Sequence, residues 1–85
     1  MSRYKRLRRR AHDREGGLCF YCNVSVNSFG DPFSRYAPTI DHIVPKSQGG
    51  QKISMINVVL ACYSCNNERG DMPAEEFLRM RYERR

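Results

Sequence analysis

The chain has 85 residues and a formal net charge of +6, from 15 lysines and arginines against 9 acidic residues. This length leaves room for one small domain, which commonly needs a staple such as a disulfide or a bound metal to outweigh the entropy of folding. The basic charge favours a polyanionic partner such as nucleic acid, and the lack of a long apolar run or a secretory h-region predicts a cytoplasmic protein without membrane contact.

In chain order, the first predicted element is a short basic helix over residues 3–15, where apolar residues recur at helical spacing. Aromatic and β-branched residues around a C-x-x-C turn predict a hairpin or zinc knuckle over residues 18–27, and the following segment to Pro38 is a loop. Two short strands are predicted next, over residues 39–44 and 57–62, joined by a polar loop.

Two helices follow the strands. Residues 65–69 can form the start of one helix. Pro73, followed by an acidic first turn, predicts another helix over residues 74–83. We therefore expect a small α+β fold in a single domain over residues 1–85. Its parts are a basic N-terminal helix or arm (1–17), a zinc-stapled core (18–70) and a C-terminal helix (71–85).

Four cysteines form two C-x-x-C pairs, Cys19 with Cys22 and Cys62 with Cys65. Each pair can place two thiolates on one tetrahedral ion, at about 2.3 Å. Two disulfides or redox-active pairs are the alternatives, but the doubled spacing and a reducing compartment favour a structural zinc ion. Four protein ligands close the coordination sphere, so the chemistry must lie elsewhere.

An acid and a histidine, Asp41 and His42, lie side by side near the end of the first predicted strand. Alone, such a pair is weak evidence, because most are surface or structural pairs. Several further motifs accompany it in order: Asp41-His42-Ile43-Val44-Pro45, Gly49-Gly50, Asn57 and Cys62-x-x-Cys65-Asn66-x-x-Arg69-Gly70. Together they resemble the zinc-binding variant of the HNH endonuclease family, over about residues 19–73.

The resemblance implies a ββα-metal fold with a structural zinc knuckle and flanking terminal helices, and a metal-dependent endonuclease that hydrolyses DNA. It implies His42 as the general base, Asp41 and Asn66 as ligands of catalytic Mg²⁺, Mn²⁺ or another divalent metal, and Asn57 as a clamp on the loop. These roles suit the residues, because neutral imidazole accepts a proton from water and an oxygen-ligated cation stabilises the leaving 3′ oxygen. Asn66 stands in place of the motif's last histidine, and an amide oxygen also ligates a hard cation.

Two positions carry further expectations. Asp41 and His42 would point to opposite faces of a regular strand, so the strand must end or twist there. Arg69 stands where many family members have lysine and shares a helix face with Asn66, so it is either a phosphate contact or a solvated helix charge. Because Asn66 adjoins Cys65, loss of zinc should disorder a catalytic metal ligand.

Seven of the 15 basic residues fall within the first 14 positions, which suits phosphate contacts, although a solvated basic arm is the alternative. The predicted nucleic-acid contacts are Arg6, Arg8, Arg9, Arg10, Lys46 and Arg69. No segment resembles a base-reading helix, so little sequence preference is expected. Aromatic residues are expected to pack within the fold rather than stack on bases.

Other functions explain part of this pattern. A non-catalytic zinc-ribbon module that binds nucleic acid would account for the cysteines and the charge, but it leaves Asp41, His42 and Asn66 unexplained. Small members of the resembled family are often phage-encoded. A role as a phage packaging accessory, or with another protein partner, therefore stays open. The expected location is a bacterial or phage-infected cell. The oligomeric state, cut-site preference, nicking or double-strand cutting, physiological metal and pathway are not predicted.

Overall fold

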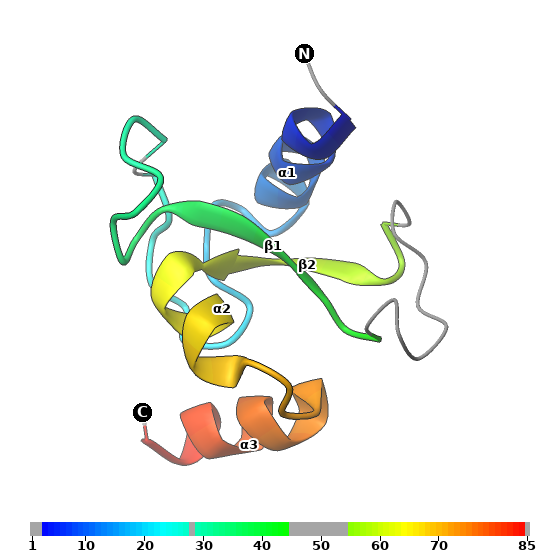
Figure 1. The fold of residues 1–85 in the computed structure, drawn as a ribbon, viewed down its shortest axis with the longest axis vertical. Coiled ribbons are helices and arrows are strands. Elements are labelled where there is room, and N and C mark those ends of the chain that lie inside the picture. Colours follow the sequence, from blue (N-terminus) through cyan, green and yellow to red (C-terminus); the bar gives the residue numbers. More distant parts are fainter. Residues whose placement is uncertain (1–2, 28, 45–54, 85) are drawn as a thin grey trace.

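The computed structural model describes residues 3–27, 29–44 and 55–84. The described elements are, in chain order, α1 (Arg3–Arg14), β1 (Pro38–His42), β2 (Val58–Cys62), α2 (Tyr63–Arg69) and α3 (Ala74–Arg84). The two strands form one antiparallel sheet, with α1 on one side of it and α2 and α3 on the other (Figure 1). The predicted α+β fold is confirmed, and the strand, strand, helix order is that of a ββα-metal fold.

The register of the sheet decides which residues of β1 face which helix. Asp41 is opposite Val59, and His42 is opposite Val58. Because side chains alternate along a strand, Asp41 and Thr39 lie on one face of the sheet, the face that α2 covers. On the other face, Leu7 of α1 packs with the buried side chains of Ile40 and Val58.

β1 ends at His42, two residues before the predicted end of the strand. The Asp41-His42 pair therefore sits at the last paired positions of the sheet, next to the loop. Both residues are paired within β1, so the strand does not end between them as expected, and alternation directs Asp41 towards α2 and His42 towards the face of Ile40 and Val58.

The outer edge of β2 is covered by the end of α1 and by the knuckle. The backbone N–H of Phe20 donates to the carbonyl of Leu60 at 2.8 Å, and the Leu60 N–H donates to Glu15 Oε2 at 2.7 Å. The Arg14 guanidinium donates to the carbonyls of Met55 and Val58, at 2.5 and 2.6 Å. Arg14 is thus part of the fold, because it satisfies edge groups that would otherwise be unpaired.

α2 begins immediately after β2, two residues before the predicted start of this helix. Cys62 is its N-cap, and the sulfur accepts a hydrogen bond from the Cys65 N–H at 3.3 Å. Gly70 ends the helix with a positive φ of 51°, a conformation that glycine adopts without a steric cost. One sulfur therefore serves both as a predicted metal ligand and as a helix cap.

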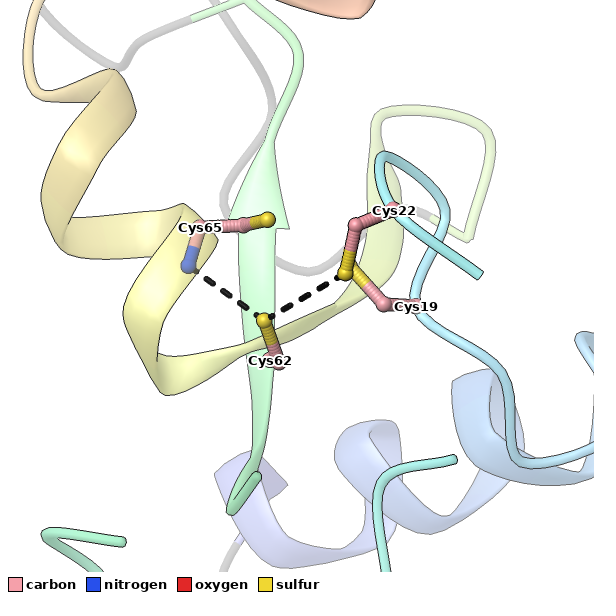
Figure 2. A group of neighbouring side chains, drawn as sticks. All are labelled: Cys19, Cys22, Cys62 and Cys65. Carbon is pink, nitrogen blue, oxygen red and sulfur yellow. Dashed lines mark hydrogen bonds between the residues drawn. The ribbon is translucent and has the colours of Figure 1, made fainter. Parts of the chain in front are cut away.

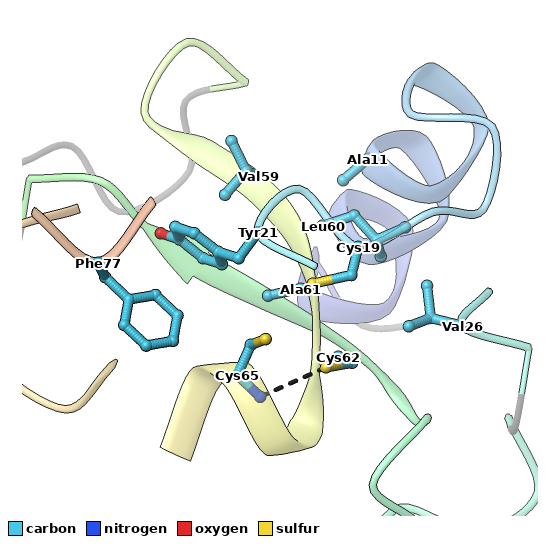
Figure 3. Packing of buried hydrophobic residues seen from close by; sticks show 10 residues of the cluster. All are labelled: Ala11, Cys19, Tyr21, Val26, Val59, Leu60, Ala61, Cys62, Cys65 and Phe77. Atoms are coloured by element: carbon cyan, nitrogen blue, oxygen red, sulfur yellow. Dashed lines mark hydrogen bonds between the residues drawn. The ribbon is translucent and has the colours of Figure 1, made fainter. Parts of the chain in front are cut away.

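The core surrounds three of the four cysteines. Tyr21 and Phe77 are fully buried and meet edge to face, with ring centroids 4.9 Å apart, so α3 docks on the knuckle (Figure 3). Cys19, Cys62 and Cys65 are buried in the same cluster. None of the described helices has the length and apolar character needed to cross a membrane. Pro45, Lys46 and the Gly49-Gly50 loop lie outside the described residues.

Candidate metal centre and active site

Two chain segments bring the four cysteines together. One is the knuckle after α1, which carries Cys19 and Cys22, and the other is the junction of β2 and α2, which carries Cys62 and Cys65 (Figure 2). The four sulfur atoms lie within 4.8 Å of one another. All are free thiols, and the 3.9 Å from Cys22 Sγ to Cys62 Sγ is far from a disulfide bond of about 2.05 Å.

This spacing fits one tetrahedral ion, because ligands 2.3 Å from zinc lie about 3.8 Å from each other. The electrostatics agree. Hydrogen bonds from Cys62 and Cys65 hold the pKa of the Cys19 thiol far below its usual range, and the hydrogen bond to Cys19 raises the pKa of Cys62 to about 11. A separate hydrogen bond, between Cys65 and Cys19, raises the pKa of Cys65 still further. Without an ion, ionisation of Cys19 thus opposes ionisation of Cys62 and Cys65. A bound divalent cation offsets this repulsion, so that the cysteines can all bind it as thiolates.

A second site lies on the α2 side of the sheet. A cavity of about 290 Å³ is lined by Ile40, Asp41, His42, Asn66, Arg69, Gly70 and Asp71. The structure thus brings four of the predicted catalytic residues to one cavity, with Asn57 outside its lining. Asp71 is a carboxylate at this cavity that no sequence motif selects. Among the described residues, the cysteine cluster is the one group of three or more cysteine, histidine or acidic side chains close enough to hold an ion.

Asp41 is buried and held through one of its two carboxylate oxygens. Arg69 Nη1 donates to Asp41 Oδ2 at 2.7 Å, and the Tyr21 hydroxyl donates to the same oxygen. Burial and this hydrogen bond raise the pKa of Tyr21, so the hydroxyl keeps its proton and remains a donor. The hydrogen bonds found within the described residues all use Oδ2, which leaves Oδ1 as the oxygen able to take a cation.

Asn66 has a fixed amide orientation. Its Nδ2 donates to the carbonyl of Ile40 at 3.2 Å and to Thr39 Oγ1 at 3.1 Å. A carbonyl only accepts, and Thr39 Oγ1 already donates its own proton to the carbonyl of Ala61 at 2.8 Å, so both partners require the nitrogen of the amide. The Asn66 amide oxygen is therefore the atom turned away from β1 and suited to ligate a hard cation.

Arg69 is buried, with 5% of its surface exposed. Besides Asp41, its guanidinium donates to the carbonyls of His42, Ile43 and Met72, at 2.9, 3.1 and 2.8 Å. The interpretation of Arg69 as a solvated helix charge is wrong, because its partners are all protein oxygens. A direct contact with phosphate stays a prediction, and it would require the guanidinium to leave some of these acceptors.

Asn57 joins the two ends of the segment between the strands. Its Oδ1 accepts from the Val44 N–H at 2.8 Å, and its Nδ2 donates to the Val44 carbonyl at 3.0 Å. The Asn57 carbonyl also accepts from the Ile43 N–H at 2.8 Å. These bonds hold the chain that leaves His42, although a role for Asn57 in catalysis stays a prediction.

The basic residues of α1 divide into two groups. Arg6, Arg9 and Arg10 are exposed, and two of them line a groove of about 500 Å³ together with Arg3 and Leu7. Arg8 is half-buried, with its guanidinium 5.4 Å from the centroid of the Phe29 ring. Arg6, Arg9 and Arg10 therefore remain open for phosphate contacts, whereas Arg8 also lies against the Phe29 ring.

Tyr21 makes the contact that sequence reasoning missed. The sequence predicts only that it packs beside the zinc, yet its hydroxyl reaches Asp41, 20 residues away in the chain. Thr39, which fixes the Asn66 amide, was likewise not selected. No periodic pattern in the sequence signals either contact, because each depends on how separate segments pack.

Comparison with known proteins identifies a family and a curated relative. The sequence model of the family described as HNH endonuclease matches residues 30–72, half of the chain. A curated protein, the CRISPR-associated endonuclease Cas9 of Corynebacterium diphtheriae, is 32% identical to this chain over 60 residues. That alignment covers 71% of this chain but only 5% of the relative, so the chain spans a small fraction of that protein's length.

Proposed function

Because the chain belongs to the HNH endonuclease family, we propose that it hydrolyses phosphodiester bonds in DNA, with His42 as the general base. The observation that carries this proposal is the cavity on the α2 side of the sheet, which Asp41, His42 and Asn66 line together. The matched relative, itself an endonuclease by name, supports the same class of reaction.

The side chains around the cavity have complementary tasks. The His42 imidazole takes a proton from the attacking water, which converts the water into a stronger nucleophile. Asp41 and Asn66 offer one oxygen each to a divalent cation, Mg²⁺ or Mn²⁺, and the rest of its coordination sphere is left for water and phosphate. When bound, that cation supplies Lewis-acid stabilisation of the leaving 3′ oxygen.

The four cysteines hold zinc in this proposal. Thiolates are soft ligands, which favour zinc over Mg²⁺ or Mn²⁺, and four of them leave no position for a substrate. Support comes from the clustering of the sulfur atoms inside the core rather than beside the cavity. The ion thus serves the fold, and the second cation serves the reaction.

DNA binding is assigned to α1 and the groove beside it. The exposed arginines at positions 6, 9 and 10 are the strongest contacts proposed, with Arg8, Lys46 and Arg69 as the further predicted ones. Such contacts neutralise phosphates without reading base edges. The proposal therefore includes affinity with little sequence preference.

A non-catalytic zinc module that binds nucleic acid is the second candidate. One observation favours it: Asp41 is already neutralised by Arg69, as in an ordinary structural ion pair. In that case the cavity would hold no catalytic cation, and the protein would bind DNA without cutting it. The two candidates differ in one measurable property, which is cleavage that depends on His42.

The test is plasmid cleavage by purified, zinc-loaded protein in Mg²⁺ or Mn²⁺. His42→Ala should lower the rate by about 10²- to 10⁴-fold, the usual contribution of a general base. His12→Ala is the matched control, because it removes the chain's other histidine, which lies on α1 and contacts Asn27. Zinc content and DNA affinity should be unchanged in both variants, and equal cleavage by both would refute the catalytic role of His42.

A further inference from the structure

Tyr21 occupies an unusual place for a residue that contacts a proposed catalytic carboxylate. It lies between Cys19 and Cys22 in the knuckle, and its side chain is fully buried. The ring extends from the cysteine cluster towards Phe77, with the hydroxyl at the end away from Cys19 (Figure 3). The hydroxyl thus leads away from the cysteine cluster and reaches Asp41, one of the residues that line the second site.

The hydroxyl belongs to a closed hydrogen-bond triangle. Arg69 Nη1 lies 2.7 Å from Asp41 Oδ2 and 3.4 Å from the Tyr21 oxygen, while the Tyr21 hydroxyl donates to Asp41 Oδ2. Two donors from different elements therefore hold the same carboxylate oxygen. This fixes the rotation of the Asp41 carboxylate and with it the direction of Oδ1.

The two C-x-x-C pairs consequently reach the two proposed ligands of the catalytic cation by separate routes. Cys65 precedes Asn66 directly on α2. The knuckle pair reaches Asp41 only through space, by way of the Tyr21 side chain. An ion that fixes the positions of Cys19 and Cys22 also fixes the backbone from which that side chain extends.

We propose that Tyr21 is a positioning residue of the active site, and that its hydroxyl transmits the geometry of the zinc knuckle to the Asp41 carboxylate. The inference rests on the proposed function, since it concerns the cation that Asp41 and Asn66 would hold. Groups that orient metal ligands from outside typically change metal affinity or activity by about 10- to 100-fold when removed. Tyr21 is expected to act in this way without contacting DNA.

The test is the variant Tyr21→Phe, which keeps the ring and removes the hydroxyl. The affinity of the zinc-loaded variant for Mn²⁺, measured by electron paramagnetic resonance in the absence of DNA, should fall about tenfold. The matched control is Tyr63→Phe, which removes a hydroxyl from within the other C-x-x-C pair, where the ring contacts Phe33 instead of Asp41. Zinc content and DNA affinity should match the wild type in both variants.

The outcomes separate this inference from the proposed function. If His42 is required for cleavage but Tyr21→Phe binds Mn²⁺ as tightly as Tyr63→Phe, the inference fails and the function stands. If wild-type protein neither cuts DNA nor binds Mn²⁺, both fail.

A second measurement avoids any effect of the substitution on folding. In wild-type protein labelled with ¹³C at tyrosine Cζ, added Mg²⁺ should shift the Tyr21 resonance and leave that of Tyr63 in place. An unchanged Tyr21 resonance at saturating Mg²⁺ would overturn the inference.

Discussion

Asp41 and Arg69 form an ion pair whose side chains are 9% and 4% exposed. Moving two charges out of water is costly, and the pair is tolerated because the guanidinium donates to several protein oxygens, while the carboxylate has a second donor in Tyr21. At the scale of the residue, the charge of Arg69 is therefore used inside the protein, to hold the end of β1 and the carboxylate of the candidate site.

The first prediction concerns this pair. Arg69→Met should lower the free energy of unfolding by about 3–5 kcal/mol, because it leaves the Asp41 carboxylate buried without a counter-charge. Urea unfolding of zinc-loaded protein measures the loss. The double variant with Asp41→Asn is the control, and it should recover part of the loss because the uncompensated charge is gone. If the double variant loses as much stability as Arg69→Met and Asp41→Asn lose in sum, the two side chains are not directly coupled.

Individual residues show where sequence reasoning ends. Asp41, His42 and Asn66 could be selected in advance because their order along the chain carries a motif, and the structure brings them to one cavity. The partners of Asp41 could not be selected. Arg69 is 28 residues away from it, and nothing in a helical pattern reveals whether a cationic side chain points to water or into the fold.

At the scale of elements, α1 combines two tasks on different faces. Leu7 and Ala11 are buried against the sheet and the core. The exposed arginines lie outside this apolar face, with Arg6 and Arg10 in the groove beside Leu7. Arg14 at the end of the helix donates to backbone carbonyls beside β2. The helix is thus docked by its apolar face and its last turn, and only its remaining basic residues are open to a polyanion.

The second prediction separates these tasks. Replacing Arg6, Arg9 and Arg10 by glutamine, which keeps helix propensity, should weaken DNA binding and reduce the slope of log affinity against log salt. The slope should fall by about 0.9 for each phosphate that the variant no longer neutralises. Fluorescence anisotropy on a labelled duplex, measured at several salt concentrations, gives the slope.

Arg14→Gln is the matched control for that measurement. It removes the same charge, but the structure assigns Arg14 to β2, so it should lower the melting temperature and leave the salt slope close to that of the wild type. A slope unchanged by the triple substitution would instead indicate that α1 is a solvated basic helix.

Element boundaries were predicted to within two residues where local chemistry defines them. α3 begins at Ala74 as expected, after Pro73 and with acidic residues in its first turn. α2 begins early because the sulfur of Cys62 caps it, and cysteine is not an ordinary capping residue. The knuckle has only one isolated bridge among its described residues, between Leu18 and Ser25, because its shape is set by the cysteines rather than by strand pairing.

At the scale of the whole molecule, the helices and strands of the described residues are short and need tertiary contacts to stabilise them. A two-stranded sheet is marginal by itself in water, and α2 spans only seven residues. The cysteine cluster lies where the knuckle, β2 and α2 meet, inside the same core as Tyr21 and Phe77. A metal bound there would link the segments that pack around both sites.

The last prediction follows from this placement. A structural zinc site contributes on the order of 10 kcal/mol at neutral pH, and a small domain is stable by about 5–15 kcal/mol in total, so removing zinc should unfold the protein. Cys65→Ser should give the same result, with loss of the cooperative circular dichroism melt and of cleavage. Brief EDTA treatment that removes only the more weakly held divalent cation is the control. It should abolish cleavage without changing the melt, and added Mg²⁺ should restore the activity. A zinc-free protein that still melts cooperatively at the wild-type temperature would show that the apolar core holds these segments together without the ion.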